Sequence, residues 1–180
     1  MPEQSPANQG ARLSLVLGGA RSGKSRYAEE LIMALPAPWT YVATAQALDD
    51  EMTARIGEHR SRRGPRWHAI EAPLDLARAI TAAPAAAPVL VDCLTLWLSN
   101  LMLADRDIDE EIERLEQALA AHAAPMVLVS NEVGFGIVPD NALSRRFRDH
   151  QGRLNQRIAA QADRVVLVVA GLPMFLKGRT

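Results

Sequence analysis

The chain has 180 residues, with 20 basic and 21 acidic side chains and a formal net charge of −1 at pH 7. Aromatic residues make up only 4% of it, and this scarcity together with the balanced charge disfavours a nucleic-acid partner. The single cysteine, Cys93, excludes an intrachain disulfide and a cysteine-rich zinc site.

Two segments bear on targeting and on membrane insertion. Residues 1–12 are polar and lack the apolar stretch of a signal peptide, so we predict a flexible N-terminal extension there and a single domain over residues 13–180. The longest apolar run, residues 165–176, is too short and too interrupted by Gly and Pro to span a membrane. We therefore expect a cytoplasmic protein without a membrane span.

Short apolar runs alternate with helical patterns along the chain. The expected strands are 13–17, 40–43, 66–70, 88–91, 126–129 and 165–169. The expected helices are 24–35, 49–63, one that begins at Pro73, 94–103, 108–123 and 141–162, the last with Leu143, Phe147, Leu154 and Ile158 on its apolar side. This alternation predicts an α/β fold with a mostly parallel sheet flanked by helices, in which ligands bind beyond the carboxyl ends of the strands.

The first expected strand is followed by GGARSGKS at residues 18–25. This is the GxxxxGKS spacing of a phosphate-binding loop, in the required context of a strand before it and a helix after it. The glycines let backbone N–H groups face phosphate oxygens, and the helix N-terminus adds a favourable potential. We expect Lys24 to reach the β- and γ-phosphates and Ser25 to offer its hydroxyl to Mg²⁺.

A phosphate loop needs a second group that organises the metal. Asp92 directly follows the apolar run 89–91 and fits the Walker B position, although an Asp that caps the next helix is an alternative. Glu132 also stands at a strand end and is the weaker metal candidate. These residues predict an enzyme acting on a magnesium nucleoside triphosphate, and by themselves fit a kinase, a GTPase or a RecA-like motor.

The helix expected over 49–63 places His59 on one face with Arg55, Arg62 and Arg63. Neighbouring guanidinium groups disfavour protonation of an imidazole, and a neutral imidazole is a nucleophile toward phosphorus. The arginines could hold polyphosphate oxygens in bidentate fashion. Taken alone, the same pattern also fits a solvated basic face with an inert histidine.

Five strings together resemble one family: GGARSGKSRYAE, YVATAQALDDEMTARIGEHR, VDCLTLWLSNL, SNEVGFGIVPDNALSRRFRDHQGRLNQRIA and VVLVVAGLPMFLKG. The chain resembles, from about Leu13 to its C-terminus, the bifunctional adenosylcobinamide kinase / adenosylcobinamide-phosphate guanylyltransferase of cobalamin biosynthesis. The resemblance implies a RecA-like P-loop NTPase fold and a homotrimer. It also implies two reactions: ATP or GTP phosphorylates adenosylcobinamide, a corrinoid, and GMP from GTP is then joined to the phosphate product, giving adenosylcobinamide-GDP and pyrophosphate.

The resemblance further implies which residues act. His59 matches the histidine that carries GMP as a covalent intermediate, and Ser25 and Asp92 are then the expected ligands of Mg²⁺. A kinase without a covalent step, which gives His59 no role, is the alternative, and a nucleotide-switched assembly protein is a more distant one. The implied nucleotide contacts are Gly18, Gly19, Ala20, Arg21, Ser22, Gly23, Lys24, Ser25, Ala43, Thr44, Ala45, Arg60, Ser61, Arg62, Arg63, Glu71 and Asp92.

Overall fold

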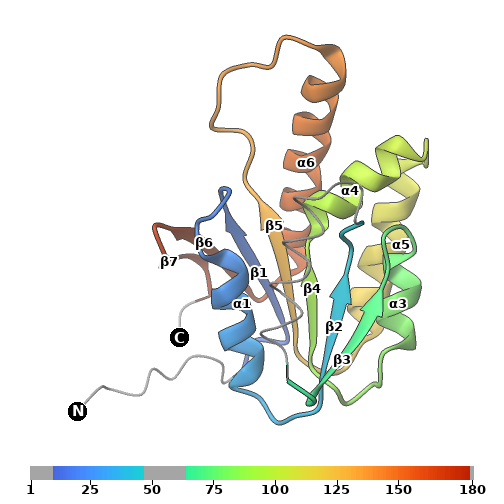
Figure 1. Cartoon of the computed structure of the whole chain (residues 1–180), viewed down its shortest axis with the longest axis vertical. Helices are drawn as coiled ribbons and strands as arrows, with labels where there is room; N and C mark the ends of the chain where they lie inside the picture. Colours follow the sequence, from blue (N-terminus) through green and yellow to red (C-terminus); the bar gives the residue numbers. More distant parts are fainter. Residues whose placement is uncertain (1–9, 47–63, 179–180) are drawn as a thin grey trace.

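A computed structural model of the protein describes residues 10–46 and 64–178. Its centre is a seven-stranded sheet in the order β3-β2-β4-β5-β1-β6-β7 (Figure 1). The strands are β1 (Leu13–Gly18), β2 (Trp39–Ala43), β3 (Trp67–Glu71), β4 (Val89–Asp92), β5 (Met126–Asn131), β6 (Arg164–Val169) and β7 (Leu172–Lys177). The helices are α1 (Lys24–Met33), α3 (Leu76–Ala82), α4 (Leu94–Leu103), α5 (Ile108–Ala121) and α6 (Ala142–Gln161).

Strands β1 to β6 pair in parallel, and β7 runs antiparallel to β6. The predicted α/β architecture with a mostly parallel sheet is therefore confirmed. Parallel neighbours need crossover connections, and helices on the two faces of the sheet supply them (Figure 1).

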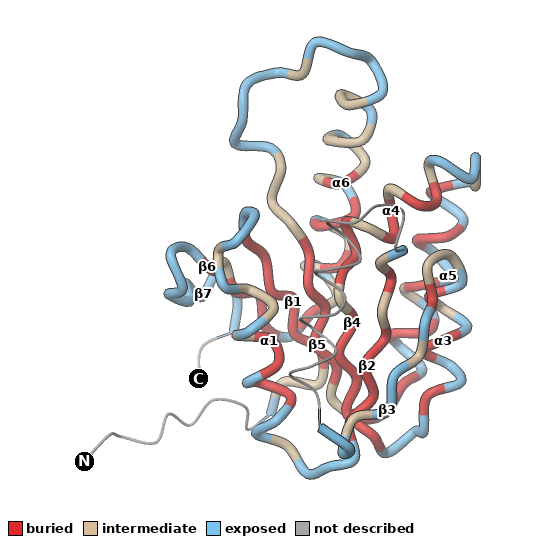
Figure 2. Tube along the Cα trace, viewed as in Figure 1, coloured by how far each residue is buried: buried red, intermediate tan, exposed pale blue. Residues whose placement is uncertain are grey.

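The sheet separates two hydrophobic cores, because successive side chains of a strand point to opposite faces. Leu13 and Leu15 of β1 belong to the core shared with α3, α4, α5 and α6. Val16 belongs to the other core, which Ala28 and Ile32 of α1 cover. Figure 2 shows that the residues of the central strands are mostly buried. Burial on both faces explains why these strands are largely apolar.

Strand β5 lies directly between β1 and β4, and this order brings three strand ends to one edge of the sheet. Gly18 of β1 is paired with Asn131 of β5, and Asp92 of β4 is paired with Val129. The first residue of the phosphate loop, the Walker B candidate and the end of β5 are thus neighbours at the carboxyl edge.

Two details differ from the sequence prediction. Strand β7 was not expected; it forms because Ala170 and Gly171 both adopt positive φ (51° and 78°), the conformation of a tight hairpin turn that folds the chain back onto β6. Pro173 is tolerated because β7 is an edge strand. Leu143 is exposed rather than packed, because the first turn of α6 extends beyond the sheet.

The helix after β3 begins at Leu76 rather than at Pro73. Ala72 N still donates to Ala43 O at 2.8 Å, so the chain follows the sheet past the end of β3 before it turns. The helix predicted over 49–63 lies outside the described residues.

Arg12 is fixed to the body of the protein, since its guanidinium donates to Leu119 O at 2.6 Å and to His122 O at 3.0 Å. Residues 1–9 lie outside the described part, and the division of the chain at residue 12 stays a prediction. Among the described helices, none is long and apolar enough to cross a membrane.

Candidate functional site

The loop at residues 18–25 has the strand–turn–helix geometry that the sequence predicts. Ser22 N donates to Gly19 O at 3.3 Å, which closes a turn at the end of β1. Gly23 has φ 94° and is the N-cap of α1, a left-handed conformation that favours glycine. Lys24 Nζ lies 3.1 Å from Gly19 O, so the ammonium group folds back across the loop.

The hairpin between β6 and β7 supports this loop from one side. Gly171 N donates to Ser22 O at 2.9 Å, so the tip of the hairpin is bonded to the middle of the loop. A Cβ on Gly18 would stand 2.8 Å from Val168 O, and a Cβ on Gly23 would stand 3.3 Å from Gly171 Cα. The β6–β7 unit therefore fixes the shape of the loop, and it packs so closely that side chains at these glycines would displace it.

Asp92 ends β4 at the same edge. Tyr41 Oη donates to Asp92 Oδ2 at 3.2 Å, and the buried Tyr41 ring packs edge-on against Trp67 with centroids 6.2 Å apart. The phenol therefore fixes the direction of the carboxylate. Sequence analysis assigns no role to Tyr41, because a tyrosine within an apolar strand has the pattern of a core residue.

Three strand ends form a row beside Asp92. Ala43 of β2 is paired with both Asp92 of β4 and Glu71 of β3, so Glu71, Ala43 and Asp92 stand side by side. Thr44 follows Ala43 and is fully buried, and its hydroxyl donates to Cys93 O at 2.7 Å and accepts from Cys93 N at 2.8 Å. The Thr44 side chain thus ties β2 to β4.

Cys93 itself is not a reactive group. Burial raises the pKa of its thiol to about 11, and the negative charge of Asp92 acts in the same direction. The thiol is therefore protonated at neutral pH, the form that is a poor nucleophile and a poor metal ligand.

Of the predicted site residues, the structure brings together the phosphate loop, Asp92, Glu71 and the end of β2. His59, Arg60, Ser61, Arg62 and Arg63 lie outside the described residues. Within residues 10–46 and 64–178, no cluster of three or more His, Cys, Asp and Glu side chains could hold a metal ion by itself. The hydroxyl of Ser25 and the carboxylate of Asp92 suit the kind of magnesium site that borrows its remaining ligands from phosphates and water.

A buried polar network that sequence reasoning missed lies under the end of β5. Gln151 Nε2 donates to Ser130 Oγ at 2.9 Å, Ser130 Oγ donates to Asn155 Oδ1 at 2.7 Å, and Asn155 Nδ2 donates to Asn131 O at 3.0 Å. The sequence does hint at this network. Gln151 and Asn155 lie one helical turn apart, next to the buried Leu154, and polar side chains on the core side of a helix need hydrogen-bond partners.

The chain leaves the sheet after β5 as a long arm, residues 132–141, that projects beyond the sheet (Figures 1 and 2). Ile137 is 96% exposed and Phe135 is 85% exposed. Arg145 donates to Pro139 O at 2.8 Å and to Asp140 O at 2.6 Å, and so fixes the arm to α6.

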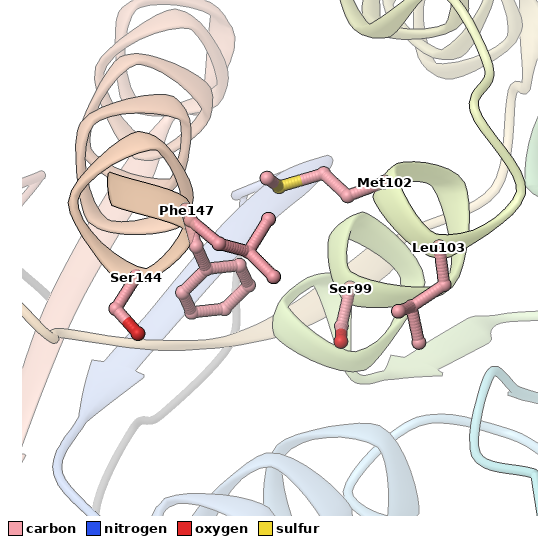
Figure 3. A pocket seen from close by; sticks show the side chains of 6 residues that line it. Ser99, Met102, Leu103, Ser144 and Phe147 are labelled. Atoms are coloured by element: carbon pink, nitrogen blue, oxygen red, sulfur yellow. The ribbon is translucent and has the colours of Figure 1, made fainter. Parts of the chain in front are cut away.

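Next to the arm, α4 and α6 enclose a hollow of about 190 Å³ (Figure 3). This volume suits one apolar side chain better than a whole ligand. The hollow is lined by Ser99, Met102, Leu103, Leu143, Ser144 and Phe147.

Comparison with known proteins decides the family. The family model described as cobinamide kinase / cobinamide phosphate guanyltransferase matches residues 14–176. The chain belongs to this family. A "bifunctional adenosylcobalamin biosynthesis protein CobP" of Pseudomonas aeruginosa is 52% identical over 167 residues, covering 91% of this chain and 96% of that protein. A "bifunctional adenosylcobalamin biosynthesis protein CobU" of Salmonella typhimurium is 47% identical, covering 91% of this chain and 98% of that protein.

Membership of the cobinamide kinase / cobinamide phosphate guanyltransferase family makes the chain a transferase with both activities. Solved structures agree with the fold. The flagellar accessory protein FlaH from Methanocaldococcus jannaschii has a TM-score of 0.54 at 12% identity, covering 93% of this chain and 79% of that one. A KaiC-like protein from Pyrococcus horikoshii has a TM-score of 0.51 at 13% identity, covering 87% and 70%. The expected RecA-like P-loop NTPase fold is confirmed.

The contact between the loop and the hairpin yields a prediction for this family member. We expect Gly18→Ala to lower the free energy of unfolding by about 1–3 kcal/mol, because the new methyl group would overlap Val168 O. Gly19→Ala is the matched control, since a Cβ there meets nothing within 4 Å. Urea-induced unfolding of the two variants measures the difference, and equal stabilities would contradict the described packing.

Proposed function

We propose that this chain phosphorylates the hydroxyl group of adenosylcobinamide with ATP or GTP and then transfers GMP from GTP to adenosylcobinamide-phosphate, with release of pyrophosphate. The observation that carries the proposal is the phosphate loop 18–25 beside Asp92 at one sheet edge, in a chain of this family. Both reactions need a nucleoside triphosphate held by its phosphates, and this edge offers backbone N–H groups, an ammonium and a carboxylate for that purpose.

The loop residues bind the triphosphate in this proposal. Backbone N–H groups of Gly18 through Ser25 bind the phosphate oxygens, and the ammonium of Lys24 swings from Gly19 O onto the β- and γ-phosphates. Ser25 and Asp92 would hold Mg²⁺, which would neutralise charge on the phosphates. Ala43, Thr44, Ala45 and Glu71 are the proposed nucleotide contacts at the ends of β2 and β3.

Guanylyl transfer proceeds through His59. An imidazole nitrogen attacks the α-phosphorus of GTP, the bond to the bridging oxygen breaks, and pyrophosphate leaves with the electron pair. A phosphate oxygen of adenosylcobinamide-phosphate then attacks the same phosphorus and frees the imidazole. Arg60, Ser61, Arg62 and Arg63 bind phosphate oxygens next to His59, a role for which guanidinium groups are suited.

The covalent step gives a direct prediction. After incubation with Mg-GTP, the wild-type chain should gain the mass of GMP on the peptide that contains His59. His59→Ala should lose this adduct and keep its kinase turnover. His68→Ala is the control, because His68 is exposed on β3 and should leave the adduct intact. A kinase that never forms the adduct would support the single-function alternative instead.

Two apolar surfaces support assembly as a homotrimer. One is the arm with Phe135, Ile137 and Val138, and the other is β7, on which Leu172 and Met174 are exposed. The two surfaces lie apart: the arm projects beyond the sheet, and β7 is the edge strand next to β6 (Figure 1). Contact between two different surfaces of identical subunits closes into a ring when the rotation allows it.

The assembly is open to a simple test. We expect the wild-type chain to run as a trimer in size-exclusion chromatography with light scattering. The double variant Phe135→Gln, Ile137→Gln should shift toward monomer, because it removes apolar area from one surface of the contact. Met33→Gln, on the exposed end of α1, should stay trimeric. A wild-type monomer, or an unchanged double variant, would contradict this assembly.

We assign the activity to the cytoplasm, where nucleoside triphosphates are available and a lone thiol such as Cys93 stays reduced. The partner is a small corrinoid rather than a nucleic acid. The balanced charge of the chain supports this choice.

A further inference from the structure

Glu132 is the first residue after β5 and stands next to the phosphate loop. Its backbone N donates to Gly18 O at 3.2 Å, the residue at which the loop begins. Because β5 lies between β1 and β4, the backbone of Glu132 follows the strand that lies between the phosphate loop and Asp92.

Hydrogen bonds on both sides of the end of β5 hold the backbone of Glu132 in position. The network of Ser130, Gln151 and Asn155 holds the end of β5 from below, and Gln151 is 0% exposed. From the other side of the strand end, Thr95 Oγ1 accepts from Asn131 N at 2.8 Å. Buried and partly buried hydrogen bonds of this kind fix a backbone segment more firmly than surface contacts do.

The side chain of Glu132 is oriented as well. Gly134 N donates to Glu132 Oε1 at 2.7 Å, and this bond turns the carboxylate back over the start of the arm. A Cβ on Gly134 would stand 2.9 Å from the same oxygen, so glycine leaves the room that this arrangement needs. The side chain remains partly exposed, so an incoming substrate can reach it.

The kinase reaction requires a proton acceptor at this edge, because a hydroxyl group must lose its proton when it attacks phosphorus. The other carboxylates at the described strand ends are less suited. Asp92 receives the hydroxyl of Tyr41 and serves the metal in the proposed function, and Glu71 ends the outermost strand β3, three strands away from β5.

We propose that Glu132 is the general base of the kinase step. The hydroxyl oxygen of the acceptor forms a bond to the γ-phosphorus, and the bond from that phosphorus to the β–γ bridging oxygen breaks. The nucleoside diphosphate leaves with the electron pair, and the hydroxyl proton moves to Glu132 Oε2. Glu132 passes the proton to water after the product leaves. This inference rests on the kinase half of the proposed function.

The test compares Glu132→Gln with Glu113→Gln in the full-length protein. Glu113 is an exposed carboxylate on α5 and provides the matched control. Kinase turnover is measured with adenosylcobinamide and ATP, the affinity for ATP by calorimetry, and the GMP adduct by intact mass after incubation with Mg-GTP.

We expect kcat of the kinase step to fall about 10²- to 10⁴-fold in Glu132→Gln. The affinity for ATP and the GMP adduct should match wild type, since neither needs this base. Glu113→Gln should behave as wild type throughout.

Kinase turnover in Glu132→Gln that stays within about threefold of wild type would overturn the inference. So would a loss of turnover that is matched by an equal loss of ATP affinity, since Glu132 would then bind the nucleotide or its metal. A wild-type chain without kinase turnover contradicts the proposed function itself. A wild-type chain that has turnover but forms no GMP adduct contradicts only the role of His59.

Discussion

The insertion of β5 between β1 and β4 is the arrangement on which the site depends. Its backbone hydrogen bonds align Gly18 with Asn131 on one side and Asp92 with Val129 on the other. The three strand ends therefore meet at one edge although they come from distant parts of the sequence. A register error of one residue in either pairing would turn the following side chains to the opposite face.

Two supports hold this edge in place. The hairpin tip at Gly171 bonds to Ser22 in the phosphate loop, and the network of Ser130, Gln151 and Asn155 holds the end of β5. The hairpin continues into β7, whose exposed apolar side chains belong to the proposed subunit contact. In the proposed trimer, assembly would therefore protect the strand that supports the loop.

Much of the fold was predictable because its strands are buried on both faces. The run Met126–Val129 is continuously apolar, and Leu13–Leu17 is apolar except for Ser14. The phosphate loop has a recognisable spacing of its own. Strand β7 was not predicted, because its apolar run is exposed and contains Pro173. It pairs with β6 only because the turn at Ala170 and Gly171 folds the chain back, and the residue types do not reveal that turn. Leu143 was misplaced since periodicity cannot tell where a helix extends past the sheet.

The site was predictable only where its residues form a motif that is contiguous in the sequence or directly follow an apolar strand. Gly18 to Ser25 and Asp92 follow from spacing and strand ends, whereas the bond from Tyr41 to Asp92 joins residues 51 positions apart and leaves no pattern in the sequence. The proximity of Glu132 to the loop depends in the same way on strand order. The residue types alone could not rank Glu132 above other acids, because strand order is set by packing of the whole sheet.

The central claim is that the loop 18–25 holds the phosphates of the nucleotide, and titration calorimetry with Mg-GTP tests it most directly. Lys24→Ala should bind GTP roughly 10- to 100-fold more weakly than wild type, the effect of removing a charged hydrogen-bond donor. Arg26→Ala removes a cation two residues away that is paired with Glu30, and it should bind GTP as wild type does. Equal affinity for GTP in wild type and Lys24→Ala would contradict the account.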